Sequence, residues 1–226
     1  MQLKSFYAIL LVFFLTLSCK DKTTETDNLF KFRDYISYTT AGRISVADHI
    51  NVSLAKTVTG WEADKELDKS IFKIKPYVEG QLKVVNDHAF TFIPDENLSP
   101  DTEYTVSVKL KDLYNDLPDG FDTYDFSFKT ITPNFVIETN NLQSYTKELQ
   151  YLNGVLKLAD ITTVDKVKQL VEASQDGKKL SIVWDEKLLP SKYFEFKIDS
   201  ITRKIDDADI LVKWNGKPIN ADNSGE

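Results

Sequence analysis

The stretch from Phe90 to Asp112, which reads FTFIPDENLSPDTEYTVSVKLKD, restricts the fold of this chain more than any other. In its second half apolar and polar side chains alternate, and the apolar ones are Tyr104, Val106, Val108 and Leu110. A period of two is the signature of a half-buried strand. The first half, FTF, has the same alternation, and a cluster of Pro, Asn, Ser and Asp lies between the halves. The pattern predicts a strand, a turn and a strand, read as the central hairpin of an antiparallel sheet.

Similar short alternating runs recur about every ten residues through the first part of the chain. They lie at Ile44–Val46, Ile50–Leu54, Phe72–Ile74, Leu82–Val84 and Tyr124–Phe128. Short strands with turn residues between them are typical of a β-sandwich. Pro133 cannot donate to a strand ladder, and the pattern restarts after it. We therefore predict a first β-sandwich over residues 35–132 and a second domain over 133–226.

The second region is also predicted to be a β-sandwich. Its expected strands lie at Phe135–Ile137, Val155–Leu158, Leu180–Trp184, Phe194–Ile198 and Ile210–Trp214, with a turn at Asn153 and Gly154 before the second of them. Between them, Val164, Val167, Leu170 and Val171 recur at helical spacing, with Thr162 as a candidate N-cap. The last residues, NGKPINADNSGE, predict no closing strand. The predicted fold class is thus all-β: two consecutive antiparallel β-sandwiches, the second with one short helix and incomplete, as in the N-terminal piece of a longer protein.

The N-terminus has the features of a secretory signal over residues 1–18. Lys4 precedes an apolar run of about a dozen residues, which is too short to span a bilayer as a permanent helix. Cys19 follows Ser18 at once, and polar residues come after it, a pattern that resembles the lipobox of bacterial lipoproteins. The resemblance implies lipidation of Cys19, a membrane anchor in the cell envelope, and a flexible tether over 19–34. The alternative is an incidental cysteine in a signal cut elsewhere.

Composition and charge exclude several classes of function. The formal charge of -7 disfavours nucleic acid and other polyanionic partners, which bind through basic patches. Cys19 is the only cysteine, and the chain has two histidines, His49 and His88, both expected on the surface. We therefore predict no catalytic residue, metal or cofactor. The acidic stretch from Asp112 to Asp125 and the carboxylates at 206–209 are interpreted as turns rather than calcium sites.

Of the three tryptophans, Trp184 and Trp214 lie on the apolar side of their predicted strands and are interpreted as core residues. Trp61, beside a glycine in a loop, is the one candidate for an exposed aromatic that contacts a ligand such as a glycan.

The residues from Ile71 to Thr130 resemble the bacterial Ig-like domain. The matching positions are Pro76, Val78, Gly80, Phe92, Pro94, Leu98, Pro100, Thr102 and Tyr104, followed by FSFKT at the end of the domain. The combination of a lipoprotein signal, this module and a second sandwich resembles the N-terminal region of bacterial alpha-2-macroglobulin-like lipoproteins. That resemblance covers most of residues 35–220.

This resemblance implies a macroglobulin-like second domain and a role as the non-catalytic scaffold and tether of an envelope protease trap, whose protease-capturing parts lie downstream. The Cys-Gly-Glu-Gln thioester motif of many such proteins is absent from this chain. Two alternatives stay open at this point: a glycan-binding or adhesin-type surface lipoprotein, and an accessory domain of a secreted enzyme.

Overall fold

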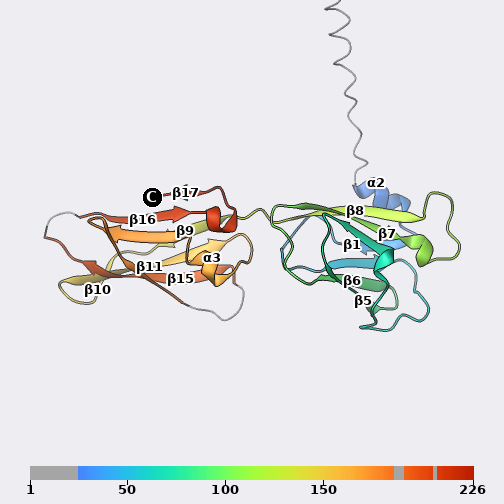
Figure 1. Cartoon of the computed structure of the whole chain (residues 1–226), viewed down its shortest axis with the longest axis horizontal. Coiled ribbons are helices and arrows are strands. Elements are labelled where there is room, and N and C mark those ends of the chain that lie inside the picture. The colour runs from blue at the N-terminus through green and yellow to red at the C-terminus, as the bar shows by residue number, and fades with distance from the viewer. Residues whose placement is uncertain (1–24, 186–190, 206–207) are drawn as a thin grey trace, which may run out of the picture.

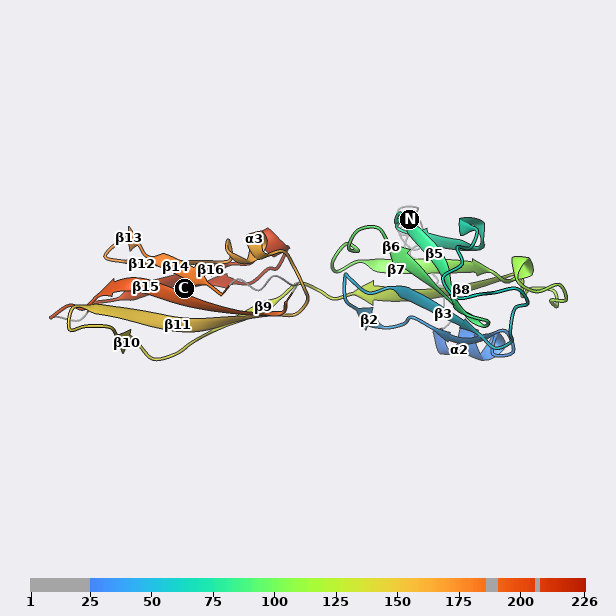
Figure 2. The ribbon, with the colours of Figure 1, turned by 90° about the horizontal axis from the view of Figure 1, so that it is seen from below.

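The computed structural model of this chain describes residues 25–185, 191–205 and 208–226. Within these ranges the elements are strands of four sheets, two short α-helices and short 3-10 turns, which confirms the predicted all-β class. Figure 1 shows two layered units that lie end to end along the long axis of the molecule. Figure 2, turned by 90°, shows the same two units joined by a single crossing of the chain.

The first unit contains two four-stranded sheets. One sheet has the order β1-β3-β6-β5 and contains β1 (Ile36–Thr39), β3 (Ile50–Leu54), β5 (Gly80–Asn86) and β6 (Ala89–Pro94). The other has the order β2-β8-β7-β4 and contains β2 (Arg43–Ile44), β4 (Phe72–Lys75), β7 (Glu103–Lys109) and β8 (Thr123–Thr130). The two-residue strand β2 runs parallel to β8. The prediction of a wholly antiparallel sandwich is therefore wrong at this one edge.

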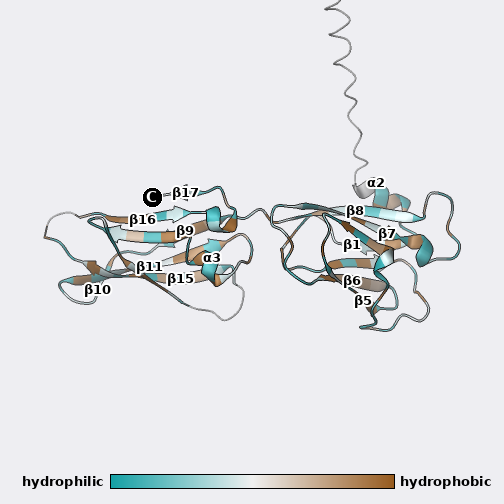
Figure 3. Cartoon of the chain, in the orientation of Figure 1, coloured by the Kyte–Doolittle hydropathy of each residue, from teal (hydrophilic) through white to brown (hydrophobic). Residues whose placement is uncertain are grey.

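One core fills the space between the two sheets of the first unit. Its fully covered side chains include Ile50, Val52, Leu82, Phe90, Val106, Val108 and Leu110. Along β7 the exposure alternates as predicted, with Tyr104, Val106 and Val108 buried. Figure 3 shows the resulting alternation of hydrophobic and hydrophilic residues along the strands. Burial of one face of each sheet against the other explains why a period of two dominates this part of the sequence.

The stretch from Phe90 to Asp112 is not a hairpin. Strand β6 belongs to one sheet and β7 to the other, so the eight residues from Asp95 to Thr102 cross between the layers. Leu98 is buried within this crossing, and the Tyr104 hydroxyl accepts a hydrogen bond from the backbone N–H of Ser99 at 3.0 Å. The burial of Leu98 and the hydrogen bond to Tyr104 stabilise this passage between the sheets relative to a tight turn. The hairpin prediction was wrong because alternation does not reveal which sheet a strand joins.

The segment before β1 is structured from Glu25 onward. Residues Glu25–Lys31 form helix α2, and Phe32 is buried with its ring centroid 4.9 Å from that of Phe121. The Lys31 ammonium donates to the backbone oxygen of Gly120 at 3.1 Å. The expected flexible tether over 19–34 is thus wrong for residues 25–34, which dock on the first sandwich. Residues 1–24, including Cys19, lie outside the described residues.

The second unit contains a five-stranded and a four-stranded sheet. The larger has the order β10-β11-β15-β14, with β9 also paired to β11, and contains β9 (Phe135–Thr139), β10 (Gln143–Ser144), β11 (Leu149–Leu158), β14 (Ser181–Trp184) and β15 (Tyr193–Thr202). The smaller has the order β13-β12-β16-β17 and contains β12 (Val171–Gln175), β13 (Lys178–Lys179), β16 (Ile210–Asn215) and β17 (Ser224–Gly225). A second core, with Leu156, Phe194 and Ile198 at its centre, lies between these sheets.

Three local predictions for the second unit were wrong. The helix α3 spans only Val164–Val167, its N-cap is Thr163, and Val171 already belongs to β12. Asn153 and Gly154 lie inside β11, where Gly154 faces the ring of Phe196, so the glycine marks a close approach rather than a turn. The C-terminal residues do form a strand, β17, which pairs with the end of β16.

In the described ranges, the remaining helical residues form three 3-10 turns. They are η2 (Lys69–Ile71), η3 (Leu110–Asp112) and η4 (Lys217–Ile219). The last of these packs beside α3 at the end of the second sandwich that faces the first one.

Candidate functional site: the joint between the two sandwiches

The chain passes between the sandwiches through residues 131–134, and backbone hydrogen bonds hold this linker to both units. On the side of the first sandwich, the Ile131 N–H donates to the Ile44 oxygen at 2.9 Å, beyond the end of β8. On the side of the second, the Ala159 N–H donates to the Asn134 oxygen at 2.8 Å. Pro133 between them restricts the backbone further. The linker is therefore tied down at both ends rather than free to swing.

Asp160, which follows β11, reaches from the second sandwich into the first. Its Oδ1 accepts a hydrogen bond from the Ser45 hydroxyl at 2.6 Å, and its Oδ2 accepts from the Val46 N–H at 2.8 Å. The N–H of the next residue, Ile161, also donates to Oδ1, at 2.9 Å. Only 6% of the Asp160 side chain is exposed, and the Lys192 ammonium lies 3.4 Å from Oδ1. One carboxylate thus joins two units whose bonded residues lie more than a hundred positions apart in sequence.

The receiving loop of the first sandwich is itself well ordered. The N–H of Ser45 donates to the Asp48 carboxylate at 2.8 Å, and the Val46 oxygen accepts from the Leu98 N–H at 2.8 Å. Both backbone groups of Val46 are therefore used, one within its own sandwich and one across the joint. Because the loop that donates to Asp160 is rigid, the Asp160 contacts are specific in geometry.

The electrostatic environment keeps Asp160 ionised. Burial by itself raises the pKa of this carboxyl, because it penalises the charged form. The hydrogen bonds from Ser45, Val46 and Ile161, with the nearby Lys192 charge, act the other way and outweigh burial. The pKa of Asp160 consequently lies below its ordinary value. A carboxylate whose oxygens are already occupied by donors is suited to holding two parts together, and less suited to proton transfer.

A cleft of about 310 Å³ lies beside this carboxylate. Its walls come from both sandwiches and include Leu98, Pro100, Pro133, Asp160, Lys166 and Ile219. Ile161 packs against the core of the first sandwich although it belongs to the second half of the chain. Apolar packing, the tied linker and the buried carboxylate thus all connect the two sandwiches at this joint.

The residues singled out from the sequence lie elsewhere. Trp61 is half-buried, and its ring meets that of Phe90 edge-on with centroids 5.9 Å apart, so it packs on the first core instead of standing free in a loop. His49 and His88 are exposed, as predicted. Trp184 and Trp214 are half-buried and pack against the second core. None of these residues contacts Asp160 in the part of the chain that the structure describes.

Asp160 was missed by sequence reasoning. It is a single aspartate after an alternating run, and its partners lie 114 and 115 positions away. An isolated carboxylate between two strands is interpreted as a solvated loop residue, and the sequence pattern around it does not indicate burial. No group of three or more histidines, cysteines and carboxylates that could hold a metal occurs among the described residues. None of the helices in the described ranges is long and apolar enough to cross a membrane.

Comparison with known families decides the identity of the first unit. Residues 30–130 match the family model described as "Bacterial Ig-like domain". The first sandwich is a bacterial Ig-like domain. The match begins within α2, in agreement with the docking of that segment on the Ig-like domain, and it ends at the last residue of β8. The macroglobulin-like nature of the second sandwich stays a prediction.

No curated protein matches the chain. Among solved structures, two of L,D-transpeptidase 3 from Mycobacterium tuberculosis, one with a faropenem-derived adduct, are 15% and 14% identical, with a TM-score of 0.30 each. They are matched over 52% and 54% of this chain, which spans 44% and 46% of theirs. An L,D-transpeptidase from M. tuberculosis H37Rv is 12% identical, with a TM-score of 0.31 and 75% of each chain covered. Likeness at this level carries no inference about activity.

Proposed function

We propose that this chain is the non-catalytic scaffold and tether of an envelope-anchored, alpha-2-macroglobulin-like endopeptidase inhibitor. The observation that supports it most is the joint, where a buried, fully hydrogen-bonded Asp160 fixes the second sandwich against the Ig-like domain. A protease trap needs a fixed support of this kind, because a large conformational closure can only act on a protease if the supporting domains keep their positions.

The N-terminal segment supports the tether role. Helix α2 is held on the Ig-like domain through Phe32 and through the Asn28 amide, which donates to the Asp125 backbone oxygen. Only residues 20–24 lie between Cys19 and Glu25, the first residue of this docked helix. Even fully extended, the six residue steps from Cys19 to Glu25 span at most about 22 Å. A lipid on Cys19 would therefore hold the Ig-like domain close to the membrane surface.

The anchor is tested by Cys19→Ala in the producing bacterium. Palmitate labelling of the parent and recovery in the membrane fraction are expected, and both are lost in the variant. Lys22→Ala, within the polar segment after the cysteine, serves as the control and keeps both. Unchanged labelling of Cys19→Ala would show that the anchor does not exist.

The inhibitor role is tested with an antibody raised against this chain. Protein purified with it from the envelope is expected to slow digestion of a large protein substrate by an added endopeptidase while leaving cleavage of a short peptide unchanged. A trapped protease remains reachable by small substrates only. If digestion of both substrates proceeds as with a control antibody, the inhibitor proposal is wrong, whatever the outcome for the anchor.

A further inference from the structure

The second sandwich has an open seam between strands β9 and β16. In the first sandwich, the inward-facing residues of the central strands are buried, for example 2%, 0% and 0% exposure for Tyr104, Val106 and Val108. Along β16 every inward-facing residue is only half-buried. These residues are Ile210, Val212 and Trp214. Ile137 of β9, across the seam, is also half-buried.

A cleft of about 550 Å³ occupies this seam. Its walls include Phe135, Ile137, Val212, Trp214 and, at one end, Glu226. At its rim, Val136 and Leu211 are 55% and 37% exposed. The cleft is thus a predominantly apolar groove that runs along the edge of the smaller sheet.

The backbone of β16 offers unpaired groups to this groove. On one side β16 pairs with β12 along five residues, but on the other side it pairs with β17 only at Trp214 and Asn215. The Asn215 N–H points to the side of β12 and donates to the oxygen of Leu170, the residue before that strand. The Gly216 N–H points the other way, to the Asn223 oxygen. Because the direction alternates along a strand, both backbone groups of Val212 and Ile210 point into the groove. Neither has a strand partner there among the described residues.

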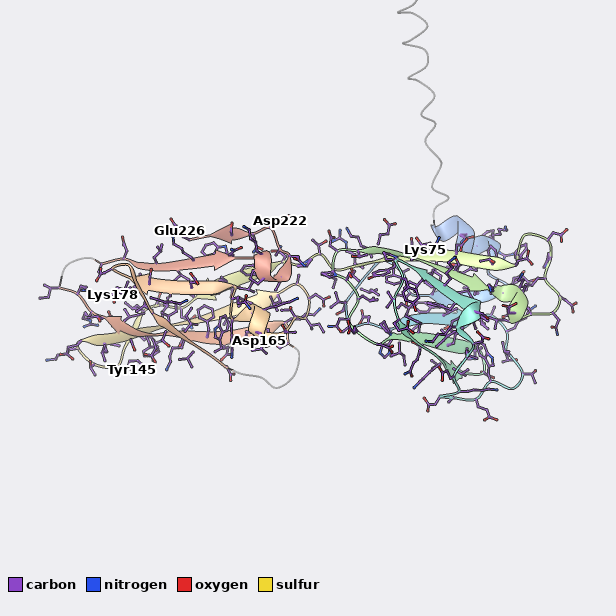
Figure 4. All side chains as sticks on the ribbon, in the orientation of Figure 1. Lys75, Tyr145, Asp165, Lys178, Asp222 and Glu226 are labelled. Carbon is purple, nitrogen blue, oxygen red and sulfur yellow. The ribbon has the colours of Figure 1, made fainter. Side chains whose placement is uncertain are left out.

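The groove already contains the beginning of a strand. Gly225 of β17 lies opposite Trp214, and Glu226 forms an ion pair with Lys213, 3.1 Å apart. Figure 4 places Glu226 beside the outer strand of this sheet, and Figure 1 shows β17 running along β16. A polypeptide that continued this antiparallel register would meet Val212 and then Ile210, with alternate side chains turned inward onto the half-buried core.

The seam also lacks the usual protection of an edge. The pairings of β9 with β11 and of β16 with β12 are regular, without a bulge, and neither edge strand contains proline. Lys213 is the one cationic residue of β16, and its ammonium forms an ion pair with Glu226. Exposed, regular and apolar edges accept additional strands unless they are covered.

We propose that this groove is a strand-acceptor site, which binds an extended segment of a partner polypeptide that is apolar at alternate positions. The segment lies antiparallel to β16 in the register begun by β17. Its backbone pairs with Val212 and Ile210, and its inward side chains cover Ile137 and Val212. This is β-augmentation, in which the main chain provides binding and alternate side chains provide selectivity.

The test uses the full chain with four residues, Val-Thr-Val-Thr, appended after Glu226, so that the probe is held at high local concentration. The first and third appended residues would face Val212 and Ile210. Amide hydrogen exchange at these two residues is expected to slow by at least about tenfold relative to the unextended chain. The matched control is Thr-Val-Thr-Val, which turns the valines outward. A second control, Pro-Thr-Pro-Thr, removes the two N–H groups that must donate.

Protection by Val-Thr-Val-Thr alone supports the strand-acceptor site. Equal exchange in all four proteins would overturn it. Protection that is already present in the unextended chain and grows with protein concentration would also overturn it, because a second copy would then be the occupant. The site concerns the second sandwich only, so its failure leaves the anchor and inhibitor proposals unaffected.

Discussion

Replacement of Asp160 by asparagine tests whether the joint holds the two sandwiches in one orientation. The amide keeps the shape of the carboxylate, and its oxygen can still accept from Ser45 and Ile161. Its NH₂ group then faces the Val46 N–H, so two donors oppose each other where Oδ2 now accepts at 2.8 Å. A buried N–H left without an acceptor costs about 1–3 kcal/mol.

The loss of charge adds to this cost. Hydrogen bonds to an ionised acceptor are roughly twice as strong as neutral ones. The Lys192 ion pair adds little, about 1 kcal/mol or less, because the lysine side chain is 47% exposed. We expect Asp160→Asn to destabilise the joint by about 2–4 kcal/mol in total. Each sandwich keeps its own core, so the change should weaken the coupling between them more than the stability of either.

The assay is the distribution of distances between the sandwiches. In a Cys19→Ser background, Lys75→Cys and Lys178→Cys place two dyes on exposed residues of the first and second sandwich, which Figure 4 shows far apart. Single-molecule energy transfer should give one narrow distribution for the parent and a broad one for Asp160→Asn. Asp165→Asn, an exposed aspartate nearby on α3, is the control and should match the parent.

The same variants give a pH dependence with a defined sign. Because the pKa of Asp160 is below its ordinary value in the folded state, its contribution is full above about pH 3.9 and is lost as the pH falls through the lower folded-state pKa. The parent distribution should therefore broaden in this acidic window, whereas that of Asp160→Asn is already broad. If Asp160→Asn is as narrow and as stable as Asp165→Asn at neutral pH, the role assigned to Asp160 is wrong.

Three further changes test the packing described above by urea unfolding. Phe32→Ala should lower the free energy of unfolding by about 3–5 kcal/mol and make residues 25–34 sensitive to protease, whereas Phe30→Ala, 67% exposed, should have little effect. Gly154→Ala should cost about 1–3 kcal/mol because its Cβ would lie 2.3 Å from the Phe196 ring, and a neutral result would contradict this packing. Tyr104→Phe should cost about 1–2 kcal/mol by removing the acceptor of the Ser99 N–H, and no loss would show that the hydroxyl does not hold the crossing.

The sequence allowed the prediction of most strands because each half-buried strand carries its own evidence. The alternation at Tyr104, Val106 and Val108 arises from one face of one strand, and it is visible without any knowledge of the neighbours. The domain boundary is likewise visible without knowledge of other segments, because Pro133 cannot donate to a strand ladder. Only the second part of the strand at Leu149–Leu158 was predicted. Gly154 in its middle is typical of a turn, and its place in the strand becomes clear only when the ring of Phe196 beside it is known.

The joint could not be predicted, because its chemistry depends on residues that are distant in sequence. Asp160 looks like any surface aspartate until the linker places it against Ser45 and Val46. The docking of α2 has the same origin, since Phe32 in a polar segment becomes a core residue only when Phe121 covers it. In both places burial is a property of two segments together.

The sequence by itself thus determined that the chain forms short, one-sided strands, and its resemblance to a bacterial Ig-like domain is confirmed over residues 30–130. The tertiary structure decided which sheet each strand joins, that β6 and β7 separate into two layers, and that β16 keeps an open edge. The physical reason is the range of the interactions. Alternating burial is encoded residue by residue along one strand, whereas strand pairing, a buried interdomain carboxylate and an uncovered groove depend on contacts between segments far apart in the chain.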